Sequence, residues 1–294
     1  MENIGEVINR ALNNGDLHND LPGDYIGEDG LLYCGKCRTP KQTRLKAEFR
    51  EFFNNAEVIP FMCKCEAEKC EREDREHKER QAALELRARY SEWLSKCFVN
   101  TAYRELTFES DKGYDPELID TARDFVERFD HYKSLRSGLL FSGSVGTGKT
   151  FAAVCIANAL LKRGIGVVFR TESELLHEAC SDKNERLRSC LKNAELFILD
   201  DFGACLKSEK QAAAIFPYID DWSASKKPLI VTTNLKLAEF KETEDVDKAR
   251  IFSRVIESCS IPVIANGRDV RRVISREKYG EFKAGGQFSA QILR

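Results

Sequence analysis

One octapeptide combines glycine, lysine and threonine at the spacing that binds a chain of phosphates. Residues 143–150 read GSVGTGKT and match G-x-x-x-x-G-K-[ST] at every fixed position. The glycines let backbone N–H groups turn inward around phosphate oxygens, and the helix that follows adds its positive end. We expect Lys149 to reach the β- and γ-phosphates of a nucleotide and the Thr150 hydroxyl to ligate Mg²⁺. The predicted phosphate-binding residues are Gly143, Ser144, Val145, Gly146, Thr147, Gly148, Lys149, Thr150 and Phe151.

Polar residues end two apolar segments further along the chain. Asp200 and Asp201 follow residues 196–199, and Asn234 follows residues 229–232. We expect Asp200 to hold Mg²⁺, Asp201 to orient the attacking water, and Asn234 to contact the γ-phosphate or that water. Many related ATPases have the longer glutamate at the position of Asp201, so we predict slow intrinsic hydrolysis.

These residues need a parallel sheet to bring them to one edge. Apolar strands are predicted at residues 138–142, 166–170, 196–199 and 229–232, with helical sequence between them, including an amphipathic helix at 151–162. In such a sheet, ligands bind at the carboxyl ends of the strands. The predicted fold class is therefore a three-layer α/β fold of the P-loop type.

Four cysteines near the N-terminus have the spacing of a metal site. Cys34 and Cys37 form a C-x-x-C pair, and Cys63 and Cys65 supply a second pair. Four thiolates close a tetrahedral Zn²⁺ site that has a structural role. Cys70 is expected to be a spare, although it is an alternative ligand. A redox C-x-x-C is the competing interpretation, but the thioredoxin-like pattern is missing.

Composition bounds the class of protein. The 294 residues are 42% hydrophobic, which suffices for an α/β core, and the net charge of −2 gives no global case for nucleic-acid binding. The first residues lack a signal-peptide pattern, and no apolar run is long enough to cross a membrane, so we expect a cytoplasmic protein. The predicted divisions are a zinc-binding module (1–65), to which only a family resemblance assigns partner recognition, a helical linker (66–97), the ATPase domain (98–285) and a C-terminal tail (286–294).

The combination of motifs resembles a known family. The GSVGTGKT loop, LFILDDFG, VTTN and ARIFSRVIES are together similar to the DnaC-type replicative helicase loaders and the related IstB transposition ATPases, within the AAA+ class. The resemblance covers roughly residues 98–280. Phage and plasmid loaders of this type often begin with a zinc-binding cysteine cluster, in agreement with the N-terminus here.

The resemblance implies further site residues. Asn234 takes the sensor-1 position, Arg254 that of an arginine finger reaching the ATP of a neighbouring subunit, and Arg271 that of sensor 2, although the adjacent Arg272 is an alternative. Residues 171–192 resemble the helical insertion that borders single-stranded DNA in these loaders. The cations expected to contact DNA there are Lys183, Arg186, Arg188 and Lys192, joined by Arg170.

Three functions follow as expectations from the resemblance. The first is an oligomeric loader that uses ATP, Mg²⁺ and Zn²⁺, shares ATP between subunits, and delivers a hexameric replicative DNA helicase onto single-stranded DNA. The second is an IstB-like transposition regulator that binds duplex DNA and a transposase. The third is a zinc-stabilised nucleotide-switch adapter without significant turnover.

Overall fold

The chain divides into two compact units, Met1–Leu84 and Glu85–Arg294, in a computed structural model. The structure describes residues 23–53, 55–205, 208–240, 245–267, 269–273, 275–276 and 279. The predicted C-terminal tail, 286–294, lies outside the described residues.

The N-terminal unit holds two short antiparallel strand pairs. Its elements are β1 (Tyr25–Ile26) paired with β2 (Leu32–Tyr33), β3 (Gln42–Arg44) paired with β4 (Val58–Pro60), and the 3-10 helix η1 (Ala47–Phe53). Among its described residues, the buried hydrophobic side chains are Cys34 and Cys63. A unit with so small a core needs another source of stability, such as a bound metal.

A long charged helix, α2 (Lys64–Cys97), follows. The predicted helix at 66–97 is confirmed, and its composition explains why it is mostly solvated: of its residues only Trp93 and Cys97 are buried. The last turns belong to the second unit, where Trp93 packs so closely on Gly166 that a Cβ there would lie 2.5 Å from the indole ring. Glycine is therefore required at position 166.

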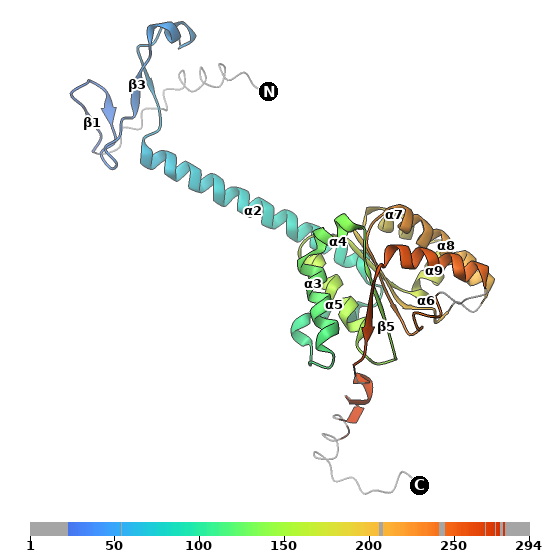
Figure 1. The fold of residues 1–294 in the computed structure, drawn as a ribbon. Coiled ribbons are helices and arrows are strands. Elements are labelled where there is room, and N and C mark those ends of the chain that lie inside the picture. Colours follow the sequence, from blue (N-terminus) through green and yellow to red (C-terminus); the bar gives the residue numbers. More distant parts are fainter. Residues whose placement is uncertain are drawn as a thin grey trace. The chain divides into compact units, whose positions relative to one another are not determined.

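The second unit is built on a five-stranded parallel sheet with strand order β6-β7-β8-β5-β9. Figure 1 labels β5 of this sheet beside the helix α5. The strands are β5 (Leu139–Gly143), β6 (Val167–Thr171), β7 (Leu196–Phe202), β8 (Leu229–Thr233) and β9 (Ile261–Ala265). Four of them confirm the predicted strands. The fifth, β9, was not predicted because Pro262 interrupts a short apolar run, and proline is accepted there because β9 is an edge strand.

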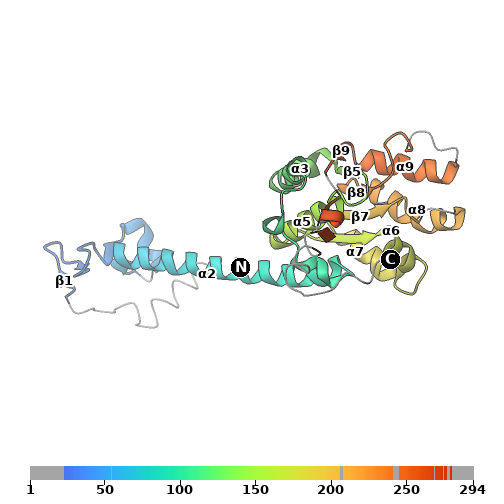
Figure 2. The same ribbon diagram turned by 90° about the horizontal axis from the view of Figure 1, so that it is seen from below.

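Helices cover both faces of this sheet. Figure 2 shows α3 and α5 on one face and α6, α7, α8 and α9 on the other. Their bounds are α3 (Pro116–Glu127), α4 (Phe129–Leu135), α5 (Lys149–Lys162), α6 (Glu172–Ala179), α7 (Asn184–Asn193), α8 (Glu209–Ala224) and α9 (Val246–Ser258), with 3-10 helices η2 (Thr101–Glu105) and η3 (Phe108–Ser110) before α3. The predicted three-layer α/β fold is confirmed.

The core lies between the sheet and these helices. Fully buried large side chains include Phe141 on β5, Phe169 on β6 and Phe197 on β7, whereas the helix α5 contributes Ile156 and Leu160. Burial of this apolar surface holds the strand ends in register, at roughly 25 cal/mol for each Å² removed from water. Within the described part of the chain, no helix is both long and apolar enough to cross a membrane.

Candidate functional site

The phosphate-binding loop joins the end of β5 to the start of α5. Gly146 and Gly148 have φ angles of 85° and 92°, a region that glycine adopts without strain. Gly143 lies so close to β9 that a Cβ would come within 2.4 Å of the Ala265 carbonyl oxygen. The loop therefore has the backbone that the sequence motif requires, with the N-terminus of α5 directed at the place of the phosphates.

Lys149 is buried at the centre of this loop. Its Nζ donates hydrogen bonds to the carbonyl oxygens of Gly143 and Ser144, both at 2.8 Å, and to Oδ1 of Asn234 at 2.9 Å. Burial lowers the pKa of Lys149, while Asp201 and Asp200 raise it and Arg271 lowers it further. The predicted residues Lys149 and Asn234 are thus in direct contact.

Asp200 lies on β7 beside Thr150, in the last residue pair that β7 forms with β6. The Thr150 hydroxyl lies 2.9 Å and 3.1 Å from the two carboxylate oxygens of Asp200, and the Thr232 hydroxyl donates to Oδ1 at 2.5 Å. Burial raises the pKa of Asp200 to about 6, against the lowering effect of these two hydroxyls. A hydroxyl and a carboxylate this close together fit a Mg²⁺ ion, which prefers oxygen ligands.

The side chain of Asp201 points away from the pairing of β7 with β8 because the backbone bends at this residue. The pairing of β7 with β8 shifts between Leu199 and Phe202, and Asp201 has a φ of 53° in the left-handed region. Its backbone N–H donates to the Thr232 hydroxyl at 3.0 Å. The side chain is exposed, and among the carboxylates it has the largest effect on the pKa of Lys149. Asp201 is therefore free to meet a water or a ligand.

An apolar cavity of about 320 Å³ adjoins the phosphate-binding loop. Thr147 and Gly148 of the loop line one side of it. The apolar lining comes from Leu106, Tyr114, Leu118, Phe151 and Val270. Its size and apolar walls suit a nucleoside, and Phe151, predicted as a binding residue, contributes to them.

The segment after β9 packs on the same loop. The backbone N–H of Val270 donates to the Gly146 carbonyl at 2.9 Å, and Asp269 lies so near that a Cβ on Gly146 would be 2.2 Å from its Oδ1. Arg271 acts on the pKa of Lys149, whereas Arg272 forms an ion pair with Asp269 at 3.2 Å. The choice between Arg271 and Arg272 as sensor 2 stays a prediction.

Arg254 lies on α9 and makes its polar contacts with acidic residues of the same chain. Its Nε is 2.7 Å from Oδ1 of Asp220, and its Nη1 is 3.0 Å from Oε2 of Glu257. The side chain remains 45% exposed. Arg254 is therefore accessible to a second molecule.

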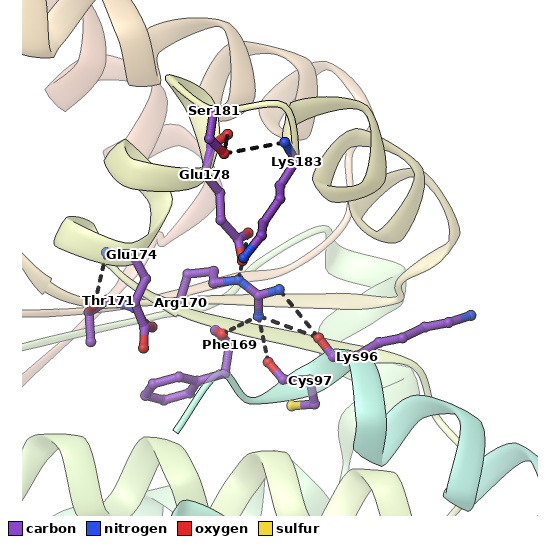
Figure 3. Close-up of polar contacts among 9 residues, drawn as sticks. All are labelled: Lys96, Cys97, Phe169, Arg170, Thr171, Glu174, Glu178, Ser181 and Lys183. Atoms are coloured by element: carbon purple, nitrogen blue, oxygen red, sulfur yellow. Dashed lines mark hydrogen bonds and ion pairs between the residues drawn. The ribbon is translucent and has the colours of Figure 1, made fainter. Parts of the chain in front are cut away.

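Arg170 has a different role from the one predicted. It is buried, its Nε pairs with Glu178 at 3.0 Å, and its Nη1 donates to the carbonyl oxygens of Phe169 and Cys97, each at 2.7 Å (Figure 3). A cation at the C-terminal carbonyls of a helix stabilises that end. The prediction that Arg170 joins the DNA-contacting cations is wrong, because its donors are used to cap α2.

The four predicted cysteine ligands meet in the N-terminal unit. The sulfur atoms of Cys34, Cys37, Cys63 and Cys65 all lie within 4.8 Å of one another, and Cys65 is 3.4 Å from Cys63 and 3.6 Å from Cys34. Tetrahedral zinc with bonds of about 2.3 Å places sulfurs roughly 3.8 Å apart. The cluster therefore fits Zn²⁺. Cys70 is exposed on α2 and is not part of this group.

Two residues of the site were missed at the sequence level. Thr232 joins the environments of Asp200 and Asp201, and its place before Asn234 at the end of an apolar strand was the available signal. Glu172 accepts hydrogen bonds from the turn after β7. Its contact depends on the crossover from β6 to β7, for which local sequence carries no sign.

A parallel sheet with a P-loop after β5, with Asp200 on β7 and with Asn234 directly after β8, defines a P-loop protein of the AAA+ type. The chain belongs to the family of IstB-like ATP binding proteins, whose sequence model matches residues 65–276.

The relatives include helicase loaders and ATP-binding proteins of insertion sequences. The chain is 29% identical over 168 residues to the replicative helicase loader DnaC of Escherichia coli (strain K12), covering 55% of this chain and 66% of that protein. It is 27% identical over 210 residues to an IS21-like ATP-binding protein of an insertion sequence from Bacteroides fragilis, covering 61% of this chain and 76% of that protein. The chain thus spans slightly under two thirds of the length of DnaC.

A solved structure shares the fold. A crystal structure of DnaI superposes with a TM-score of 0.50 at 24% identity, over 60% of this chain and 95% of that one. This likeness concerns the fold of the ATP-binding unit.

Proposed function

We propose that this protein is an ATP-dependent loader that binds a replicative DNA helicase and delivers it onto single-stranded DNA. The observation that carries the proposal is a nucleotide site in which Lys149 contacts Asn234 and Thr150 contacts Asp200, on a chain similar to DnaC. The helicase and the DNA are inferred from the similarity to DnaC. The use of ATP is inferred from the nucleotide site.

Each polar group of the site has a proposed task. Lys149 exchanges its loop carbonyls for the β- and γ-phosphates, and Thr150 and Asp200 hold Mg²⁺. A bound Mg²⁺ neutralises the charge that develops on the phosphates. Asp201 orients the attacking water, and Asn234 donates to the γ-phosphate or to that water. The apolar cavity beside Phe151 holds the nucleoside.

A second subunit completes the site. Arg254 is accessible, and in a neighbouring molecule it gives up Asp220 and Glu257 for the γ-phosphate, where an arginine stabilises transition-state charge. The active form of the proposed loader is therefore an oligomer in which ATP is shared between subunits.

DNA contact is assigned to the α6–α7 segment. Lys183, Arg186 and Lys192 have exposed side chains there, and Arg188 is half-exposed while paired with Asp221 at 2.9 Å. With Arg170 removed from the set, the contact rests on these four cations. Their contacts to phosphate carry no sequence preference and weaken as salt concentration rises.

The N-terminal unit is proposed to recognise the helicase. Phe49 and Phe52 stand three residues apart on η1, where such residues share a face, and they are 49% and 76% exposed. Phe61 and Met62 are exposed immediately before Cys63. Large exposed apolar side chains on a small metal-stabilised unit are typical of a protein-binding surface.

The family match also keeps the transposition function as an alternative. Its supporting observation is the similarity to the IS21-like protein, which covers 76% of that relative. A regulator of that kind binds duplex DNA and a transposase. A nucleotide switch without turnover is the third interpretation, and the exposed carboxylate of Asp201, directly after Asp200, argues against it.

The functions are separated by capture of partners. Tagged protein is incubated with extract of its own host and ATP, and bound proteins are identified by mass spectrometry, with Lys149→Ala as the matched variant. Recovery of a replicative helicase that depends on Lys149 supports the loader. Recovery of a transposase without a helicase moves the function to the transposition branch.

A further inference from the structure

Glu172 is a buried carboxylate that no step proposed above uses. It is the first residue of α6, and it is 1% exposed. A buried charged group is costly unless hydrogen bonds satisfy it, so its partners indicate what it is held for. Those partners come from the turn that directly follows the two aspartates of the nucleotide site.

Both oxygens of Glu172 accept hydrogen bonds from the same turn. Oε1 accepts from the backbone N–H of Gly203 at 3.1 Å, and Oε2 accepts from that of Cys205 at 2.5 Å. Burial raises the pKa of Glu172, and the backbone N–H groups of Cys205 and Gly203 act in the opposite direction by stabilising the carboxylate. Glu172 therefore fixes residues 203–205 at two points with one side chain.

This turn closely follows Asp201, whose backbone is left-handed. Asp201 has a φ of 53° and Gly203 a φ of 89°, and the intervening Phe202 is buried at the end of β7. A left-handed conformation at a residue with a side chain persists only where its surroundings hold it. The backbone N–H of Asp201 donates to the Thr232 hydroxyl. Two residues further on, the N–H of Gly203 donates to Glu172.

We infer that Glu172 is a positioning residue for Asp201: through the turn at 203–205 it holds the Asp201 carboxylate where that group orients the attacking water. The inference rests on the proposed ATP hydrolysis. Because Glu172 begins α6, it also ties the helix proposed to lie near DNA to the hydrolytic carboxylate. The start of α6 is itself fixed by a capping box between Thr171 and Glu174.

Turnover and binding of ATP are measured for Glu172→Gln. The amide keeps the size of the side chain but presents an N–H₂ group to one of the two N–H donors, so the turn loosens. A misplacement of about 1 Å costs up to about 100-fold in rate, and we expect kcat to fall at least about tenfold. The Kd for ATP should change less than about twofold, since no group that binds phosphate is altered.

Two further variants separate positioning from a general loss of structure. Glu174→Gln changes the same helix by the same chemistry without touching the turn, and glutamine also serves in a capping box, so turnover should stay at the wild-type level. Asp201→Asn removes the carboxylate that is being positioned. The double variant Glu172→Gln with Asp201→Asn should be no slower than Asp201→Asn alone, because both changes act on one group.

Amide hydrogen exchange gives a readout that does not depend on turnover. Residues 203–205 should lose protection in Glu172→Gln and keep it in Glu174→Gln. Wild-type turnover together with unchanged protection in Glu172→Gln would overturn the inference. If the wild-type protein hydrolyses no ATP under any condition, the proposed hydrolysis fails, and positioning of a hydrolytic carboxylate fails with it. Loss of protection at 203–205 would then leave Glu172 only a structural role in the turn.

Discussion

Nζ of Lys149 lies 2.9 Å from Oδ1 of Asn234, a hydrogen bond that joins the phosphate-binding loop to the end of β8. The two residues are 85 positions apart, and they meet because β5 and β8 are neighbours in the parallel sheet. A nucleotide that draws Lys149 toward its phosphates must break this bond. We predict that Asn234 then contacts the γ-phosphate.

Replacement of Asn234 by alanine tests this link. Asn234→Ala should leave the Kd for ATP within about threefold, because Lys149 and the rest of the phosphate-binding loop are unchanged. It should lower kcat by about 10²-fold, the cost typical of losing one hydrogen-bond donor to the transition state. Asn193→Ala on α7, where the amide only caps a neighbouring carbonyl, is the control and should turn over normally. Equal turnover in Asn234→Ala and wild type would exclude a role of Asn234 in hydrolysis.

The raised pKa of Asp200 predicts a dependence of stability on pH. Burial raises this pKa to about 6, above the roughly 3.9 of an unfolded aspartate. Its contribution is therefore fully present below about pH 4 and is lost as pH rises through 6. At about 1.4 kcal/mol for each pKa unit, ionisation costs the folded protein about 2–3 kcal/mol at pH 7.

Asp200→Asn removes that cost. In Mg²⁺-free buffer the variant should exceed wild type in free energy of unfolding by about 1–3 kcal/mol at pH 7.5, and the difference should shrink toward pH 4. Added Mg²⁺ with nucleotide should raise the Tm of wild type and not that of the variant. Denaturant melts at three pH values measure this, and a difference that is constant with pH would contradict the assignment of the pKa to Asp200.

Arg254 and Lys149 should complement each other between subunits. Arg254→Ala and Lys149→Ala are each expected to lose nearly all turnover, since an arginine finger contributes about 10³-fold or more. A mixture of the two variants should regain activity, because subunits with Lys149→Ala supply the finger to intact sites in subunits with Arg254→Ala. Arg250→Ala, one turn away on α9, serves as the control. No recovery on mixing, with oligomers present, would place Arg254 outside the site.

Zinc content tests the cysteine cluster. Purified protein should carry about one equivalent of Zn²⁺, and Cys34→Ser should hold less than half of it, because three thiolates leave the tetrahedral site open. Cys70→Ser, whose side chain is exposed on α2, should retain the metal and the Tm of wild type. Metal loss in Cys70→Ser but not in Cys65→Ser would reassign the fourth ligand.

Sequence patterns predicted much of this molecule for physical reasons that are local. Lys149, Thr150 and Asp200 lie in motifs whose chemistry depends on a few neighbouring residues. The many charged residues of 66–97, almost without Gly or Pro, favour an exposed helix. The edge strand β9 was missed because its pairing with β5, not its propensity, stabilises it.

The sequence could not show which charged side chains are buried. Arg170 looked like the cations of α7, yet the end of α2 covers it and uses its donors. From the sequence, Glu172 has the pattern of an ordinary acidic residue in the first turn of a helix. Only the fold shows that Gly203, in the turn after β7, donates a hydrogen bond to it. Both errors concern charged side chains whose partners are distant in sequence, where a local pattern carries no information.

Transfer of a helicase onto DNA tests the proposed function most directly. The purified replicative helicase of the host is mixed with this protein, ATP and closed circular single-stranded DNA, and helicase that remains on the circle is counted after gel filtration. We predict that the wild-type protein increases helicase on the circle at least about tenfold and that Lys149→Ala does not. An unchanged amount of helicase, together with ATP-dependent binding of this protein to duplex DNA, would contradict the loader and favour the transposition alternative.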